Sequence, residues 1–353
     1  VPFVPHPAPL LLEGEGIDCP LPYTVLLPQQ TNLGFAGGNN VGIKWALEHG
    51  YDYVYLHNQD GFLEPDALEP LVSVMESDKN IAVAQSLLLL YPETHLLNNA
   101  GNSFHYLGFG FCSEYRKPFT DYMTSIGNEG GSAFGVLIPS PPAPSPKGRG
   151  GIELASVNPK LVLDIPYASG AACMVRADAI RKYGLLDEDF FMYHEDLEWC
   201  FRFKMVGMRT VLVPDSRFYH EYQFSRSMEK YYYMERNRFG ILLMFYKLPT
   251  LILLMPMFFI MEIGLWFFAW RGGWVDKRRA VYQYWLKREN VRLWLAKRKR
   301  IQKIRTISDR DILKISSPGI YFQEKEVEHP LLVYIANPVM WGYYWMLRAV
   351  VWW

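Results

Sequence analysis

Three carboxylates and one imidazole in this sequence stand at positions where side chains often do chemistry. Asp60 and His220 each come after an apolar run that has the composition of a β-strand. Glu195 and Asp196 open a segment whose apolar residues recur at helical spacing. An aspartate can act as a general base, and a carboxylate together with an imidazole can hold a divalent cation. If these three element ends converge on one edge of a sheet, they form a site.

Each of these residues also has a structural explanation when it is taken alone. Acidic residues in the first turn of a helix cap its free N–H groups and interact favourably with its dipole, which would account for Glu195 and Asp196. His220 could be a buried histidine with its hydrogen bonds satisfied, and Asp60 could be a turn residue before Gly61. The occurrence of all of them, in this order, favours the site.

The elements that must position these residues alternate between strand and helix, and we therefore expect an α/β fold with a mostly parallel sheet. A glycine-rich turn is expected at residues 34–40, between the first strand and the first helix. Residues 86–135 are expected to be rich in loops, and the Pro/Gly-rich insert at 139–151 to be extended, without a chemical role. The expected strands are 23–27, 53–56, 81–85, 162–166, 168–175 and 210–213, and the expected helices are 41–49, 65–77 and 177–183.

Composition excludes several classes of protein. Half of the 353 residues are hydrophobic and a fifth are charged, which excludes a disordered tail, a collagen and a coiled coil. The four cysteines are far apart and form no C-x-x-C pair, so neither a zinc site nor a disulfide framework is indicated, and a reducing compartment fits best. The first nine residues contain four prolines and lack the basic start of a signal peptide.

The last third of the chain has the character of a membrane-associated region. Residues 248–270 would span about 35 Å as a helix, enough to cross a bilayer, but Pro256 and Glu262 favour a kinked, tilted or re-entrant segment. Residues 331–353 are predicted to form an interfacial helix pair. Residues 271–305 hold 13 basic and two acidic side chains in a chain of zero net charge. Their apolar and aromatic neighbours favour membrane lipids over nucleic acid, and the basic flank indicates the cytoplasmic side.

The chain resembles family 2 glycosyltransferases, especially the bacterial rhamnosyltransferase-like branch, over roughly residues 23–240. The resemblance is carried by an ordered set of short motifs. They are the run Asn32-Leu33-Gly34-Phe35-Ala36-Gly37-Gly38-Asn39-Asn40-Val41-Gly42-Ile43, Asn58-Gln59-Asp60 followed by Pro65-Asp66, Ser169-Gly170-Ala171-Ala172, Gly184-Leu185-Leu186-Asp187-Glu188-Asp189-Phe190-Phe191, Glu195-Asp196, and His220.

The resemblance implies a GT-A fold in residues 1–240, followed by a membrane-associated helical region in residues 241–353. It implies that Asp196 is the catalytic base with Glu195 as a supporting carboxylate, and that Mg²⁺ or Mn²⁺ is held by Asp60 and His220. It places the nucleotide diphosphate sugar donor at Asn32, Gly34, Gly37, Gly38, Asn39, Asn58 and Asp60. It places the acceptor, which would be lipid-linked or a polysaccharide, at Gly170, Ala171 and His194.

The sequence departs from the family pattern in two ways. Asn58 replaces the first aspartate of the family's D-x-D element. No counterpart of the family's first strand, helix and second strand precedes Tyr23, so we expect an N-terminally incomplete domain of low stability and activity. The expected function is inverting transfer of a sugar, rhamnose by resemblance, at the cytoplasmic face of the plasma membrane, with attachment through 248–270. The alternative is an inactive or truncated transferase that serves as a membrane-bound scaffold or is a gene fragment.

Overall fold

The computed structural model describes residues 11–12, 24–128, 161–221, 231–321 and 330–353. The Pro/Gly-rich insert at 139–151 lies outside the described residues, as does most of the segment before Tyr23.

The central sheet of the protein is mixed. Its main strands lie in the order β3-β10-β5-β11-β4, with β6 paired to β5 and β9 paired to β11. β5 and β11 are parallel, and β3 points the same way because β10 lies antiparallel between β3 and β5. The strands are β3 (Tyr53–His57), β4 (Gly61–Leu63), β5 (Ile81–Leu90), β6 (Leu97–Asn99), β9 (Leu163–Asp164), β10 (Ala172–Arg176) and β11 (Arg209–His220).

The expected α/β class is confirmed, but the expectation of a mostly parallel sheet is wrong. Among the described strand pairs of this sheet, only β5 with β11 is parallel. The reason is that β10 reverses direction within the sheet, while β4, β6 and β9 are short antiparallel strands at its margins. The reversal has a consequence for function. The start of β10 lies at the same edge of the sheet as the end of β3, since Ala172 pairs with His57.

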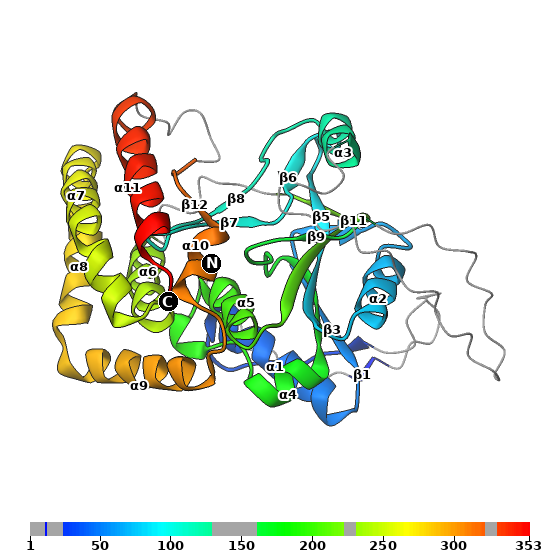
Figure 1. The fold of residues 1–353 in the computed structure, drawn as a ribbon. Coiled ribbons are helices and arrows are strands. Elements are labelled where there is room, and N and C mark those ends of the chain that lie inside the picture. The colour runs from blue at the N-terminus through cyan, green and yellow to red at the C-terminus, as the bar shows by residue number, and fades with distance from the viewer. Residues whose placement is uncertain (1–10, 13–23, 129–160, 222–230, 322–329) are drawn as a thin grey trace.

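Helices cover both faces of this sheet (Figure 1). α2 packs on one face through Leu71, Val74 and Met75, and α1, α4 and α5 pack on the other. β5 reads Ile-Ala-Val-Ala-Gln-Ser-Leu-Leu-Leu-Leu and is buried along its whole length, as a central strand covered on both faces must be. The helices are α1 (Gly34–Glu48), α2 (Leu68–Ser77), α4 (Ala177–Tyr183) and α5 (Glu195–Met205).

Residues 86–135 contain more regular structure than expected. β5 extends to Leu90, and β6, β7 (Asn102–His105), β8 (Gly110–Cys112) and α3 (Phe119–Asn128) follow it. β7 and β8 form a small sheet with β12 (Ser316–Ser317). β6, β7 and β12 are only two to four residues long and rich in Asn and Ser, so they give no clear alternating pattern in the sequence.

The C-terminal helices pack directly on the α/β unit and share its hydrophobic core. The boundary expected at residue 240 falls inside α6 (Tyr231–Phe245), where Gly240 lies against the ring of Trp294 with no room for a Cβ atom. The close approach of α6 to α9 therefore requires glycine at this position. The remaining helical segments are α7 (Leu248–Gly272), α8 (Val275–Leu286), α9 (Arg288–Ile304), α10 (Asp309–Lys314), η4 (Leu332–Ala336) and α11 (Asn337–Val350).

Glu262 of α7 is neutralised by a buried ion-pair network. Arg238 of α6 and Arg278 of α8 both contact its carboxylate, and both also bind Glu235. Two buried carboxylates thus face two buried guanidinium groups, an arrangement that compensates charges whose isolated burial would be costly. Among the described residues, α7 alone is long and apolar enough to cross a membrane, judged by length and composition.

Candidate functional site

The strand-end residues Asn58, Asp60 and His220 lie in direct contact. Asn58 Nδ2 is 2.5 Å from Asp60 Oδ1 and 3.2 Å from His220 Nε2, and the same imidazole nitrogen is 3.1 Å from Asp60 Oδ1. Pairing of β4 with the end of β11 brings them together, because Gly61 lies opposite His220 in the register. The expected convergence of Asp60 and His220 is therefore present.

The other ring nitrogen of His220 fixes how this cluster can bind a cation. Its Nδ1 is 3.0 Å from the Oδ1 atom of Asn98. When Nδ1–H donates to that oxygen, Nε2 presents a lone pair toward Asp60 Oδ1, and two acceptors face each other. Burial lowers the pKa of His220, and the opposing effect of Asp60 is smaller. A neutral imidazole beside a carboxylate is a donor set that fits a divalent cation, with Mn²⁺ accepting the nitrogen more readily than Mg²⁺.

Within the described part of the chain, no group of three or more His, Cys, Asp or Glu side chains forms a metal-binding cluster. Asp60 and His220 would therefore supply two ligands, and the rest of the coordination sphere would come from substrate phosphates and water, as is common for Mg²⁺ sites. The side chain of Asp60 is 42% exposed and that of His220 only 7%, so the carboxylate is the accessible member of the pair.

Asp196 lies in the first turn of α5, where the sequence predicted it. Its Oδ2 accepts a hydrogen bond of 3.2 Å from the Gly170 N–H, and its Oδ1 accepts one of 2.7 Å from the Leu197 N–H. The next residue, Ala171, accepts a 2.8 Å hydrogen bond from the Asn58 N–H. Since Gly170 contacts Asp196 and its neighbour Ala171 contacts Asn58, the distance between the Asp196 carboxylate and the Asn58 backbone is at most about 14 Å. The turn before β10 thus joins the two halves of the site.

The pair Glu195 and Asp196 has perturbed acidity. Burial raises the pKa of Asp196 to about 6, against the opposing effect of the Gly170 and Leu197 N–H groups. Burial and the neighbouring Asp196 raise the pKa of Glu195 well above its ordinary value. The Oε2 atom of Glu195 is buried and has no hydrogen-bond partner among the described residues. Neighbouring buried carboxylates with raised pKa values are typical of acid–base sites.

The glycine-rich segment lies in the first turns of α1, and the expectation of a free turn at 34–40 is wrong. The helix begins at Gly34, because Asn32 Oδ1 accepts the Gly34 N–H at 2.9 Å and Asn39 bonds the Phe35 carbonyl within the helix. A Cβ atom at Gly34 would lie 2.4 Å from the Phe191 carbonyl oxygen. Gly37 is buried, and Gly38 is exposed with open space beside it. The start of α1 is thus packed on the segment that leads to α5.

We call that segment, residues 187–194, the approach loop. Phe191, Tyr193 and His194 have φ values of 63°, 63° and 67°, which are unfavourable for residues with a side chain. His194, expected to contact the acceptor, is buried, and its Nε2 lies 3.1 Å from the Gly108 carbonyl oxygen. Burial lowers the pKa of His194 to about 4. The ring of His194 therefore anchors the loop.

Two side chains of α6 hold the approach loop in this strained shape. The buried Asn237 Nδ2 group lies 3.0, 3.0 and 2.7 Å from the carbonyl oxygens of Phe190, Met192 and Tyr193. Arg236 donates to the carbonyls of Asp189 and Phe190 at 2.7 and 2.8 Å. These bonds satisfy carbonyl groups that an irregular backbone would otherwise leave unpaired.

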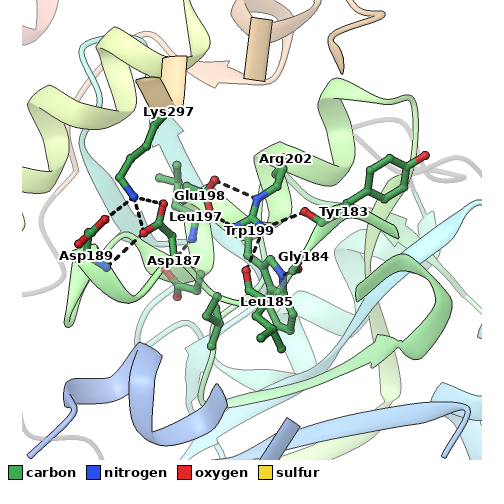
Figure 2. Close-up of polar contacts among 12 residues, drawn as sticks. Tyr183, Gly184, Leu185, Asp187, Asp189, Leu197, Glu198, Trp199, Arg202 and Lys297 are labelled. Atoms are coloured by element: carbon green, nitrogen blue, oxygen red, sulfur yellow. Dashed lines mark hydrogen bonds and ion pairs between the residues drawn. The ribbon is translucent and has the colours of Figure 1, made fainter. Parts of the chain in front are cut away.

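Lys297 of α9 binds the start of the same loop (Figure 2). Its ammonium group lies 2.6 and 2.5 Å from the two carboxylate oxygens of Asp187 and 2.7 Å from Asp189. On the other side of Figure 2, Arg202 pairs with Glu198 inside α5 and donates to the carbonyls of Tyr183 and Leu185. Residues 183–189, which lead into the approach loop, are therefore held by charged side chains of α5 and α9.

Sequence reasoning did not assign roles to several of these residues. Asn98, which orients His220, lies in a short strand with no motif signal. Lys297 is one of 13 basic residues in a segment that was assigned to lipid binding. Asn237 and Arg236 lie in the basic and aromatic stretch just before the apolar segment 248–270. Because Asn237 stands between two arginines, the local sequence gives no signal that its side chain is buried or that it holds a loop.

Comparison with known proteins supports the resemblance. Residues 157–286 match the family model described as glycosyl transferase family group 2. The low-salt glycan biosynthesis hexosyltransferase Agl10 of Haloferax volcanii is 24% identical over 172 residues, which cover 48% of this chain and 43% of that protein. The dTDP-rhamnosyl transferase RfbF of Shigella flexneri is 20% identical over 189 residues, which cover 54% and 49%. The chain thus matches less than half the length of each relative.

Among solved structures, that of GalNAc-T7 with UDP, GalNAc and Mn²⁺ matches with a TM-score of 0.38 and 13% identity. The match covers 56% of this chain and 32% of the other, and is too distant to carry an argument. The family match contains the turn before β10, the approach loop, Asp196 and His220. Residues 157–286 are therefore similar to glycosyl transferase family group 2, and the curated relatives that the chain resembles are glycosyltransferases.

Proposed function

We propose that this protein transfers a sugar from a nucleotide diphosphate sugar to an acceptor hydroxyl, with inversion at the anomeric carbon and with Asp196 as the general base. The observation that carries the proposal is the position of the Asp196 carboxylate. It lies at the start of α5 and accepts a hydrogen bond from the Gly170 N–H. The carbonyl of the next residue, Ala171, accepts a hydrogen bond from the N–H of Asn58, which follows β3 and contacts Asp60.

The acidity of Asp196 suits this role. A base with a pKa of about 6 is mostly ionised at pH 7 and accepts a proton more readily than an ordinary aspartate. Its Oδ1 and Oδ2 atoms are oriented by the backbone N–H groups of Leu197 and Gly170, so the carboxylate is fixed before an acceptor binds. Glu195, with its raised pKa, keeps a proton and avoids placing a second negative charge beside Asp196.

Asp60 and His220 would hold Mg²⁺ or Mn²⁺, with Asn58 as a neighbouring amide. When bound, the cation would neutralise negative charge on the diphosphate leaving group. The first turns of α1, with Asn32, Gly34, Gly37, Gly38 and Asn39, would lie along the nucleotide, where N–H groups at a helix start favour phosphate. Gly170, Ala171 and His194 would border the acceptor.

The finer features of the proposal are the sugar, the acceptor and the location. Rhamnose is favoured by the resemblance to RfbF, whose name gives a dTDP-rhamnosyl transferase. A lipid-linked or polysaccharide acceptor, and attachment at the cytoplasmic face of the plasma membrane, fit the apolar α7 and the basic residues that follow it. Asp60, Asp196 and His220 are all present and lie toward the same edge of the sheet, which favours a transferase over an inactive scaffold protein.

Donor hydrolysis and transfer by the purified full chain would test the proposal. We would incubate it with dTDP-, UDP- and GDP-sugars, Mn²⁺ and a lipid-phosphate acceptor, and measure nucleoside diphosphate release. The proposal predicts release with at least one donor, loss of release with a chelator, and a product of inverted anomeric configuration by NMR.

Matched variants separate the site from the fold. Asp178→Asn changes an exposed carboxylate on α4 that pairs with Arg181, and should leave release unchanged. Asp60→Asn should raise the Mn²⁺ concentration needed for half-maximal rate by at least about tenfold, because a charged ligand is lost. Full activity of Asp60→Asn at the parent Mn²⁺ requirement, or a product of retained configuration, would contradict the proposal.

A further inference from the structure

The helix α7 has two sharply different faces. One face packs on the protein through the buried residues Thr250, Leu254, Met257, Glu262 and Ala269. The other carries a stripe of large exposed apolar side chains at steps of mostly three or four residues along the whole helix. They are Leu248, Ile252, Met255, Phe259, Ile260, Ile263, Phe267 and Trp270.

The segment η4–α11 adds a second apolar surface next to this stripe. α11 packs beside α7, where the Tyr343 hydroxyl donates to the Leu253 carbonyl at 2.5 Å (Figure 1). Four tryptophans mark this surface and the end of α7, namely Trp270, Trp341, Trp345 and Trp352, which are 45–75% exposed. We define the apolar face as the exposed stripe of α7 together with the exposed residues Leu331, Val333, Tyr334, Ile335, Val339, Trp341, Trp345, Met346, Val350 and Trp352.

The packed face of α7 is tied to polar groups over most of its length. Trp353 Nε1 donates to Thr250 at 2.9 Å near one end, and the Arg238 and Arg278 guanidinium groups bind Glu262 in the second half. Trp266 Nε1 lies 3.3 Å from the Tyr282 hydroxyl of α8, farther on. If α7 crossed a bilayer, these partners would have to enter the hydrocarbon with it.

The helix α8 makes a crossing orientation especially costly. It begins three residues after α7 ends and packs back along it (Figure 1). Asp276 and Arg279 of α8 have side chains that are 96% and 66% exposed. Charged groups of this kind are disfavoured in the hydrocarbon core of a membrane. The geometry therefore favours a helix that lies along the membrane surface.

The charges on α8 and α9 indicate what covers the apolar face. Eight exposed cations lie between the end of α7 and the end of α9, against the acidic side chains of Asp276 and Glu289. The cations are Arg271, Arg279, Lys287, Arg288, Arg292, Lys299, Arg300 and Lys303. An uncharged stripe of this length, with Trp at its margins and cations on the adjoining helices, matches a leaflet with anionic headgroups. Two copies of this chain would instead bring like charges together.

We propose that α7 and η4–α11 form an in-plane anchor, which enters one leaflet of an anionic membrane through the apolar face without spanning the bilayer. Both ends of α7 then lie at the same depth, and α8, α9 and the α/β unit stay on the same side of the membrane. The anchor does not depend on the proposed transfer reaction, since binding can be measured without substrate.

Vesicle flotation tests the surface. The full chain should float with vesicles of phosphatidylcholine and phosphatidylglycerol, and less with phosphatidylcholine alone. Phe259→Glu combined with Ile263→Glu should lower the partition coefficient at least about tenfold, because two carboxylates must leave water. Leu68→Glu combined with Val72→Glu changes two exposed apolar residues of α2 and should have no effect. Equal flotation of both double variants would overturn the proposal.

Depth measurements separate an in-plane helix from a spanning one. A fluorescent label would be placed at Ile252→Cys, Phe259→Cys or Phe267→Cys and quenched by lipids brominated at known depths, with the unsubstituted chain giving the background of the native cysteines. The in-plane anchor predicts similar depths for all three labels. A spanning helix predicts a difference of about 22 Å between the first and the last. That difference would overturn the proposal, as would a stable dimer in detergent-free buffer that the α7 double variant dissociates.

Discussion

Replacement of Asn237 by alanine is expected to loosen the approach loop that sets the start of α5. The side chain of Asn237 is fully buried, and its amide nitrogen lies within hydrogen-bond distance of three carbonyl oxygens of the loop. Loss of a buried hydrogen bond that leaves an acceptor unpaired costs about 1 kcal/mol or more. The Phe190 carbonyl keeps its hydrogen bond from Arg236, so the loss falls on the bonds to Met192 and Tyr193. Because these lie in a segment with three residues of positive φ, we expect a loss of about 2–4 kcal/mol in the free energy of unfolding.

Thermal unfolding and steady-state turnover would measure the two consequences separately. The Tm should fall by about 5–10 °C, and kcat by about ten- to a hundredfold at temperatures where the variant is folded, since a small displacement of a reacting group is costly. Asn237→Asp keeps the shape but turns both donors into acceptors, so it should be no better than Asn237→Ala.

A matched control is provided by Asn290, whose amide donates to a single carbonyl, that of Tyr284, at 2.8 Å. Asn290→Ala should cost no more than about 1 kcal/mol and leave kcat unchanged. If Asn237→Ala and Asn290→Ala had the same Tm and the same kcat, the assignment of Asn237 as a positioning residue would be refuted.

Four further predictions concern the acidity of Asp196, the metal ligands and the buried network. The rate of transfer should rise with pH through an apparent pKa near 6 and level off above about pH 7, because Asp196 must lose its proton; a flat profile from pH 5 to 8 would contradict this. Burial raises the pKa of Asp196 in the folded protein above its value in the unfolded chain, so folding takes up protons between about pH 4 and 6, and this residue lowers stability as the pH rises through that window. Asp196→Asn should therefore unfold at a higher Tm than the parent at pH 7.5. A lower Tm would contradict the claim that burial of the ionised carboxylate is destabilising. His220→Ala should abolish any rise in Tm on addition of Mn²⁺, whereas a preserved rise would place the cation elsewhere. Glu262→Ala leaves two guanidinium groups with one carboxylate and should destabilise the fold by about 3–5 kcal/mol, as measured by urea unfolding; a loss below about 1 kcal/mol would show that the network is hydrated.

The sequence was informative where a local pattern decides the structure. The helix at residues 177–183 is found where the sequence predicted it, and Asp196 lies in the first turn of a helix. The apolar residues that recur at helical spacing after it, Leu197, Cys200, Phe201 and Met205, are buried. The α/β class follows from the alternation of elements. The cost of an unpaired Glu262 in an apolar segment also indicated that this residue needs partners, which the structure identifies as Arg238 and Arg278.

The remaining features depend on contacts between distant segments, which no local pattern encodes. The reversed direction of β10 is a property of the sheet and not of its five residues. α1 begins at Gly34 despite the low helix propensity of glycine. The Gly34 N–H donates to Asn32 Oδ1, and the Asn40 side chain ties the helix to Leu186 and Glu188. Lys297 could not be singled out among many basic residues, since its role depends on two carboxylates more than a hundred positions away.

The central claim, that Asp196 accepts the acceptor's proton, is tested most directly by single-turnover kinetics of Asp196→Asn at saturating donor and acceptor. The account predicts a rate at least about a thousandfold below that of the parent chain, while the dissociation constant of the donor changes by less than about threefold, because the amide keeps its place but cannot take a proton. A variant that reacts within tenfold of the parent rate would contradict the account.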